Sequence, residues 1–206
     1  MSTALQGGIR KITAQLRYLA KRNKIKEFKT YVRQEKVLEN LKDYSPYCLA
    51  TTIQSFNQIG VKNDNLWDKL SEYFYQKLDE MSVGDLLMSI NAFSQKKSEN
   101  MDWQALEQII IQKWPEVLEK EHIIFLPYIF AKNQKGSPVF WEMILRDLPA
   151  FIKICKETSM VNNVWAFYLM KIYDKPLWEG ITLSISCVNV SLVKIRIWES
   201  AHDNDP

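Results

Sequence analysis

The side chains in this sequence that are best suited to chemistry are the cations near its amino end. Residues 1–33 hold nine Lys or Arg and one acidic residue, Glu27, so they carry a formal charge of +8. Because the whole chain carries +3, the remaining residues carry −5. Binding to RNA draws most of its affinity from Lys and Arg on phosphates. We therefore predict phosphate contacts for seven of these cations: Arg10, Lys11, Arg17, Lys21, Arg22, Lys24 and Lys26.

Residues suited to catalysis or metal binding are few and scattered. The three cysteines, Cys48, Cys155 and Cys187, show no CxxC spacing, and His122 and His202 are the two histidines. Paired carboxylates, a Ser-His-Asp arrangement and a Gly-rich phosphate loop are absent from the sequence. We therefore expect no enzyme, with no catalytic residue, no metal, no cofactor and no small-molecule substrate.

The basic segment at residues 9–33 also has an apolar stripe opposite its cations. Several interpretations stay open. The segment is amphipathic, basic and free of acidic residues through residue 26, which is typical of a mitochondrial transit peptide. It also suits a basic arm bound to ribosomal RNA, a plain helical cap with a solvated charged face, or a peripheral membrane contact. The stripe consists of Ile9, Ile12, Leu16 and Leu19.

The elements that position these residues follow from an internal repeat of 37 residues. Three columns share this period: a buried aromatic residue, an apolar residue ten positions later, and a small polar residue of the type that caps helix N-termini. The aromatic column is Phe56, Phe93, Phe130 and Phe167. The capping column is Asn63, Asn100, Ser137 and Asp174. Apolar and capping columns locked to one period predict a true repeat.

Each repeat predicts a pair of helices. Leu49, Ile53 and Phe56 follow the i, i+4, i+7 spacing of one helical face. First helices are expected at about 46–59, 83–97, 121–133 and 159–172, and second helices at about 64–79, 102–119, 138–154 and 175–197. Because one hairpin cannot bury its apolar stripe alone, neighbouring hairpins are expected to stack. The sequence therefore predicts an all-α fold, an α-solenoid of about four helical hairpins with a basic N-terminal helical cap.

The predicted domain organisation follows from these repeats. Residues 1–44 form the basic N-terminal segment, in which Ile12, Leu16 and Leu19 precede Leu49, Ile53 and Phe56 by 37 residues. No Trp follows there, so this segment is expected to be a degenerate capping repeat. The array spans 45–198, in repeats at about 45–81, 82–118, 119–155 and 156–198. A polar tail, 199–206, follows.

Two segments depart from the pattern. Pro127 falls inside the first helix of the third repeat, where it should remove a backbone hydrogen bond and kink or shorten the helix. Residues 181–198 alternate like a strand but also fit a helical stripe. The repeat register favours a helix there, and both structures stay open.

Polar residues flank the core Phe on the first helix of each repeat. Asn and Gln can pair with base edges, and Tyr can stack on a base. We predict RNA contacts for eight residues of this repeat face: Gln54, Asn57, Gln58, Asn91, Gln95, Tyr128, Lys132 and Asn163. An ordinary solvated or partner-contacting face is the alternative, because the repeats are net acidic.

A 37-residue helical hairpin with an aromatic-Ala-Phe core and a Leu-Trp opening its second helix resembles the heptatricopeptide repeats. The resemblance covers about residues 45–198, and the segments VWAFYLMKIYDKPLWEGI, SINAFSQ, YIFAKNQ and NLWDKL carry it. This family is related to the octotricopeptide repeats and to the helical repeats of FAST-kinase-like and RAP-domain proteins. The resemblance implies mitochondrial or plastid residence, binding to single-stranded RNA, and work in organellar RNA maturation or translation.

Together, the residues and the resemblance predict a non-catalytic, RNA-associated helical-repeat subunit of a mitochondrial ribosome or a related organellar ribonucleoprotein. The expected location is the mitochondrial matrix, and the expected partners are organellar RNA and neighbouring proteins of a large complex. No apolar run reaches the roughly 18 residues of a membrane-spanning helix, so no transmembrane segment is expected. The alternative is a protein-binding scaffold subunit of another mitochondrial complex, such as the respiratory chain or ATP synthase.

Overall fold

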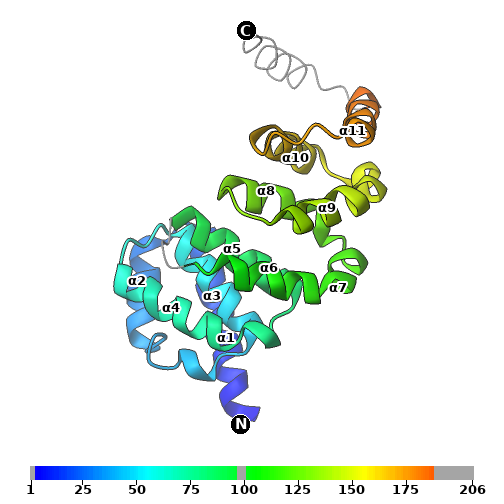
Figure 1. Cartoon of the computed structure of the whole chain (residues 1–206). Coiled ribbons are helices and arrows are strands. Elements are labelled where there is room, and N and C mark those ends of the chain that lie inside the picture. Colours follow the sequence, from blue (N-terminus) through cyan, green and yellow to red (C-terminus); the bar gives the residue numbers. More distant parts are fainter. Residues whose placement is uncertain (1–2, 97–100, 188–206) are drawn as a thin grey trace. The chain divides into compact units, whose positions relative to one another are not determined.

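The computed structural model describes residues 3–96 and 101–187. Within these ranges the regular structure is entirely helical, which confirms the all-α prediction (Figure 1). The chain divides into two compact units, unit 1 from Met1 to Lys113 and unit 2 from Trp114 to Pro206. In the described part of the chain, no helix combines the length and the apolar character that crossing a membrane requires.

Unit 1 contains the basic segment, the first repeat and the second repeat as far as Lys113. Its helices are α1 (Thr3–Lys21), α2 (Ile25–Gln34), α3 (Pro46–Gln58), α4 (Asp64–Gln76), α5 (Val83–Lys96) and α6 (Trp103–Gln112). Helix α1 packs against α3, and α3 packs against α5. We call the first helix of each pair, here α1, α3 and α5, an A helix, and the second a B helix.

Unit 2 contains the remaining repeats, in which α8 and α10 are the A helices. Its helices are α7 (Trp114–Glu119), α8 (Leu126–Lys132), α9 (Pro138–Asp147), α10 (Glu157–Leu169) and α11 (Lys175–Cys187). Helix α10 packs against α8, as the neighbouring A helices of unit 1 pack against each other. Neighbouring A helices therefore pack against each other within each unit.

The B helices are shorter than the sequence predicted. Helix α4 ends at Gln76 and gives way to the 3₁₀ helix η2 (Leu78–Glu80), and α9 gives way to η4 (Leu148–Ile154). The segment expected at 102–119 is divided into α6 and α7. Pro115 and Pro149 explain the last two breaks, since proline has no N–H to bond the carbonyl four residues earlier. For the ambiguous tail, α11 shows helix as far as Cys187, and 188–198 lie outside the described residues.

Pro127 shortens its helix as expected. The short 3₁₀ helix η3 (His122–Phe125) replaces the first turn, and α8 begins only at Leu126. Pro127 therefore occupies the first turn of α8, where its missing N–H breaks no helical bond.

The capping column predicted from the sequence is confirmed at three of its four positions. Side-chain oxygens of Asn63, Ser137 and Asp174 accept hydrogen bonds from the N–H three residues later, at 3.2, 3.2 and 2.9 Å. Asn100 lies outside the described residues, and the cap of α6 is instead Asp102, which accepts from the Ala105 N–H at 3.0 Å. The N-cap of α6 therefore lies two residues later in the chain than the 37-residue period predicts.

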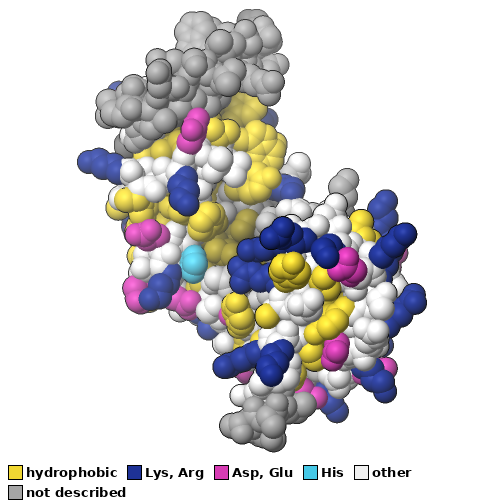
Figure 2. All heavy atoms as spheres, turned by 180° about the vertical axis from the view of Figure 1, so that it is seen from behind, with side chains coloured by type: hydrophobic (Ala, Val, Ile, Leu, Met, Phe, Trp, Pro, Cys, Tyr) yellow, Lys and Arg dark blue, Asp and Glu magenta, His cyan; other side chains and the backbone are white. Residues whose placement is uncertain are grey.

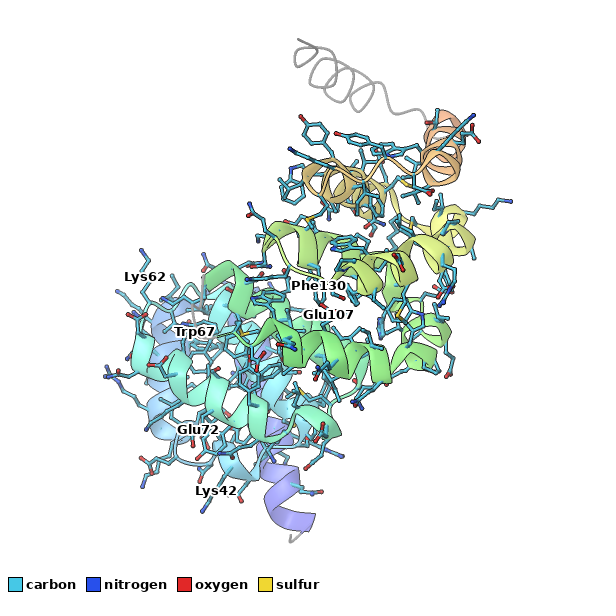
Figure 3. All side chains as sticks on the ribbon, in the orientation of Figure 1. Lys42, Lys62, Trp67, Glu72, Glu107 and Phe130 are labelled. Atoms are coloured by element: carbon cyan, nitrogen blue, oxygen red, sulfur yellow. The ribbon has the colours of Figure 1, made fainter. Side chains whose placement is uncertain are left out.

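The Trp column closes the turn between the two helices of a repeat. The indole N–H of Trp67 donates to the carbonyl of Val61 at 2.8 Å, and Trp67 lies inside unit 1 (Figure 3). Equivalent bonds to the carbonyl six residues earlier are made by Trp141, at 3.2 Å, and by Trp178, at 3.0 Å. Each Trp thus ties the start of the B helix to the turn that leads into it.

The A helices end on a left-handed residue that recurs with the same period. The residues are Asn23, Gly60, Gln134 and Lys171, with φ of 52°, 68°, 54° and 55°. The N–H that follows each of them bonds to the carbonyl of the core residue, as Val61 does to Phe56 at 3.2 Å and Ile172 to Phe167 at 2.9 Å. Asn23 belongs to this series, so the basic segment shares the turn geometry of the repeats.

An aromatic ring of α2, α4 and α9 packs on the core Phe of the next repeat. Trp67 lies edge-on to Phe93, with ring centroids 5.7 Å apart, and Trp141 lies edge-on to Phe167 at 6.3 Å. In the basic segment, Phe28 makes the same contact with a core Phe, at 5.2 Å. Phe28 is the fourth residue of α2, as Trp67 is of α4, because α2 begins two residues early. The structural counterpart of the Trp is therefore present in the basic segment, where the sequence indicated none.

Candidate nucleic-acid interface

The predicted contact residues lie around the core residue of each A helix, which is Leu19 in α1 and a Phe in the others. Because a residue two positions from a buried residue lies on a different side of the helix, the −2 and +2 positions face away from the core. The −2 column is Arg17, Gln54, Asn91, Tyr128 and Trp165, and the +2 column is Lys21, Gln58, Gln95, Lys132 and Leu169. In each unit, we call the surface formed by these two columns the A-helix face. In unit 1, Arg17 and Lys21 of the basic segment occupy the same columns as the amide residues of α3 and α5.

In unit 1 the A-helix face runs across α1, α3 and α5. Helix α1 contributes the exposed cations Arg17 and Lys21. The guanidinium of Arg17 donates to the hydroxyl of Tyr47 on α3, at 3.4 Å. The Asn57 amide on α3 donates to the Gln95 side chain on α5, at 2.8 Å. The first bond joins α1 to the first turn of α3, and the second joins the last turn of α3 to α5.

The remaining cations of the basic segment are also exposed, with different partners. Lys24 pairs with Glu27 at 2.9 Å, and this hydrogen bond raises the Lys24 pKa. The Arg22 guanidinium lies 5.8 Å from the centroid of the Tyr18 ring. Among the described residues, no ion pair is made by the other predicted contacts: Arg10, Lys11, Arg17, Lys21 and Lys26. These five are therefore available to an anionic ligand.

The repeat-face residues of unit 1 differ in how accessible they are. Gln58 and Gln95 are exposed, whereas Asn57 and Asn91 are half-buried. Gln54 is also half-buried, and its side-chain oxygen has no hydrogen-bond partner among the described residues. The accessible amides of α3 and α5 are therefore those at +2.

In unit 2 the A-helix face is aromatic. The rings of Tyr128 on α8 and Trp165 on α10 lie with their centroids 5.7 Å apart. The Lys132 ammonium lies 5.7 Å from the centroid of the Tyr128 ring. Trp165 is 42% exposed and Tyr168, one turn further along α10, is 39% exposed. The structure thus brings together two predicted contacts, Tyr128 and Lys132, with a Trp that was not among them.

Asn163 does not reach this face. It lies four positions before Phe167 and is only 2% exposed, and its side-chain oxygen has no partner among the described residues. Applying the −2 register to the fourth repeat identifies Trp165 instead. The signal was therefore present in the sequence, as an alignment column rather than as a residue type.

Figure 2 shows how side-chain types are distributed on one face of each unit. Lys and Arg side chains gather on unit 1, and hydrophobic side chains are uncovered on unit 2. The exposed large hydrophobic residues of unit 2 include Phe125, Val139, Ile154, Trp165 and Tyr173. A polyanion is therefore favoured on unit 1, and apolar or aromatic groups are favoured on unit 2.

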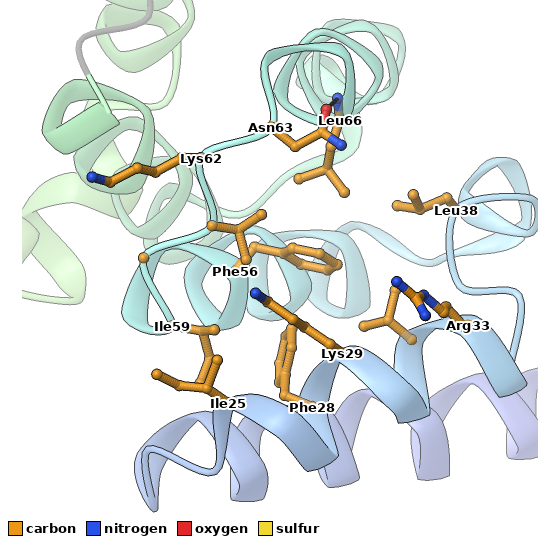
Figure 4. A pocket seen from close by; sticks show the side chains of 13 residues that line it. Ile25, Phe28, Lys29, Arg33, Leu38, Phe56, Ile59, Lys62, Asn63 and Leu66 are labelled. Carbon is orange, nitrogen blue, oxygen red and sulfur yellow. Dashed lines mark hydrogen bonds between the residues drawn. The ribbon is translucent and has the colours of Figure 1, made fainter.

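A groove of about 640 Å³ lies in unit 1 between α2 and the turn from α3 to α4 (Figure 4). Lys29 and Arg33 rise from α2 beside it, and none of its lining residues is acidic. Phe28 and Phe56 form its base but are 0% and 2% exposed, so neither ring offers a surface for stacking. The groove adds positive charge beside the B helix α2 without adding aromatic surface.

The cysteine and histidine side chains that the structure describes, Cys48, Cys155 and His122, are buried or partly buried. Cys48 is buried, and burial raises the pKa of Cys155, so its reactive thiolate is disfavoured. Burial also lowers the pKa of His122. No group of three or more metal-ligating side chains occurs among the described residues. The side chains of Cys187 and His202 lie outside this part of the chain.

No protein-family model matches this chain, and no curated protein matches it either. Its similarity to the heptatricopeptide repeats therefore rests on the residues and the period alone.

Proposed function

We propose that this protein is a non-catalytic helical-repeat protein that binds single-stranded RNA along its A-helix face. In this proposal the repeats stack as one α-solenoid of the heptatricopeptide type. The protein serves as a subunit of a mitochondrial ribosome or a related organellar ribonucleoprotein. The observation that carries the proposal is that Arg17 and Lys21 of α1 occupy the same columns as the amides of α3 and α5, while α1 packs on α3 and α3 packs on α5.

Cations and amides are expected to contribute differently to RNA binding along this surface. Cations provide affinity through phosphates and release of counterions, which is independent of sequence. Amide groups such as that of Gln95 can exchange hydrogen bonds with base edges, which single-stranded RNA leaves unpaired. The five cations without an ion pair keep their charge available, because a cation already paired with a carboxylate gains less from a phosphate. Because residues 34–206 carry a net charge of −5, phosphate binding depends on the cations of residues 1–33.

The test is a pair of matched double variants of the whole protein. Arg17→Gln with Lys21→Gln removes two charges from the A-helix face. Lys42→Gln with Lys69→Gln removes two exposed charges from elsewhere on unit 1. Both variants have the same net charge, so a general electrostatic effect would be equal in the two.

The measurement is fluorescence anisotropy with a labelled single-stranded RNA at several salt concentrations. Loss of two phosphate contacts should reduce the slope of log K against log salt by about 1.4 in the Arg17/Lys21 variant. The Lys42/Lys69 control should match wild type. Equal slopes in the two variants, or no binding by wild-type protein, would refute the proposal.

A protein-binding scaffold is the second candidate. The side chains of Val139 and Ile154, 60% and 50% exposed, favour it because they belong to α9 and η4 rather than to the A helices. Sedimentation of the tagged protein from organelle lysate separates the two functions. Migration with ribosomal particles that is lost on ribonuclease treatment supports the RNA-bound subunit, and nuclease-resistant migration with a membrane complex supports the scaffold.

A further inference from the structure

We propose that Trp165, supported by Tyr128 and Lys132, forms a platform on which a base of single-stranded RNA stacks. This inference rests on the proposed function and assigns the contact chemistry of unit 2. It adds Trp165 to the contact residues and gives Lys132 a phosphate as its ligand.

The ring geometry suits a stacking site. Tyr128 lies against Trp165 from the adjacent A helix, with centroids 5.7 Å apart and ring planes at 51°. This contact holds the indole in place, while 42% of Trp165 stays exposed to a ligand. Tyr168 is 39% exposed and lies three residues further on the same helix, so it borders the platform. A flat aromatic group can therefore cover the indole without displacing a core residue.

The charge at the platform favours a nucleotide over a neutral aromatic group. The Lys132 ammonium lies over the Tyr128 ring, 5.7 Å from its centroid, and makes no ion pair among the described residues. No carboxylate occupies the −2 or +2 positions of α8 and α10, which are Tyr128, Lys132, Trp165 and Leu169. An aromatic surface bordered by a cation and free of carboxylates complements a base attached to a phosphate.

The register points to the same ligand as in unit 1. Trp165 and Tyr128 occupy the column that holds Arg17, Gln54 and Asn91 in the other A helices. Stacking does not depend on the identity of the base, since every base has an aromatic face. The aromatic end of the column therefore contributes affinity without sequence preference, whereas the amides contribute hydrogen bonds.

The experiment compares variants of the full chain by anisotropy with a labelled single-stranded RNA of about 16 nucleotides. Trp165→Ala should weaken binding roughly 5- to 150-fold, because a base–aromatic stack contributes about 1–3 kcal/mol. Trp165→Phe keeps a ring and should recover most of the affinity. Tyr173→Ala is the matched control, since Tyr173 is 70% exposed but lies in the turn before α11. Its binding should equal that of wild type.

An oligomer of the same length with abasic sugars identifies stacking. It should bind wild type and Trp165→Ala equally, because it offers phosphates but no bases. Lys132→Gln should reduce the salt slope by about 0.7, whereas Trp165→Ala should leave the slope unchanged.

The outcomes separate this inference from the proposed function. If wild type binds RNA but Trp165→Ala behaves like Tyr173→Ala, the platform is refuted and RNA binding stands. Equal losses on normal and abasic oligomers also refute stacking. If Trp165→Ala leaves RNA binding intact but removes a co-purifying protein, the aromatic surface is a protein contact and the inference is overturned. If wild type binds no RNA, the proposed function itself fails.

Discussion

Replacing Trp67 by Phe tests whether the indole that closes each turn contributes to stability beyond its bulk. Trp67 is 4% exposed, and its N–H donates to the Val61 carbonyl at 2.8 Å. Phe preserves an edge-on ring contact with Phe93 but removes the donor. The lost hydrogen bond should cost about 1 kcal/mol and the lost ring volume about 1 kcal/mol more. We expect Trp67→Phe to destabilise unit 1 by about 2 kcal/mol.

The control for this substitution is Trp165→Phe. Trp165 is 42% exposed, and the same change there removes no buried hydrogen bond seen in the described residues. Its cost should stay below about 0.5 kcal/mol, as for most surface substitutions. Trp141→Phe in unit 2 should repeat the Trp67 effect, because its N–H makes the equivalent bond to the Lys135 carbonyl.

The assay combines urea unfolding, followed by far-ultraviolet circular dichroism, with amide hydrogen exchange. Exchange is needed because two compact units can unfold separately, which invalidates a single two-state free energy. The Val61 amide, bonded to the Phe56 carbonyl at 3.2 Å, should exchange faster in Trp67→Phe. A cost equal to that of Trp165→Phe, or an unchanged Val61 exchange rate, would refute the hydrogen-bonded closure of the turn.

Two further predictions concern unit 2. They are the cost of Gly136→Ala, with Gly60→Ala in unit 1 as its control, and the pH dependence of the Asp147 contact. Gly136→Ala should destabilise the protein by about 2 kcal/mol, because φ is 102° and the new Cβ would lie 2.6 Å from the Trp141 indole nitrogen. At Gly60, where φ is 68° and no atom lies within 4 Å of the added Cβ, alanine should cost about 1 kcal/mol, and thermal unfolding compares the two. The hydrogen bond from Arg146 lowers the pKa of Asp147. The stability that this bond contributes is therefore fully present above about pH 4, and it is lost as the pH falls through the lowered pKa of Asp147 in the folded protein. Asp147→Asn should therefore lose less stability on acidification than wild type in urea melts, and an equal loss would contradict this.

The helices and their order could be predicted because the core and the caps repeat with one period. Buried Phe at 37-residue spacing fixed the A helices to within a few residues, apart from the one shortened at Pro127. The side-chain caps, such as Ser137, fixed the starts of the B helices. Both signals depend on residue type, which a sequence displays directly.

The turn geometry could not be predicted in the same way. The left-handed position after four of the A helices is filled by Asn23, Gly60, Gln134 and Lys171, and of these only asparagine and glycine are residue types that favour a positive φ. The hydrogen bond to the core carbonyl enforces this conformation whatever the side chain. Backbone bonding, rather than residue type, therefore preserves the turn.

The early start of α2 shows how a fixed period can mislead. Aligned by 37 residues, the position of Trp67 corresponds to Thr30, which is exposed. Because α2 begins two residues early, Phe28 takes the fourth helical position and packs on Phe56. Packing against the neighbouring core, and not the count of residues, decides which ring is buried.

The A-helix face varies in chemistry while the core beneath it does not. Phe56 and Phe167 are both buried, yet the residues two positions before them are an amide and an indole. A helix surface that contacts solvent alone would favour charged residues with high helix propensity, such as Lys or Glu. Leaving 42% of Trp165 in water instead exposes apolar surface that would gain free energy on burial. A ligand that covers the indole recovers this free energy, so the −2 position is where the chemistry of binding should be sought.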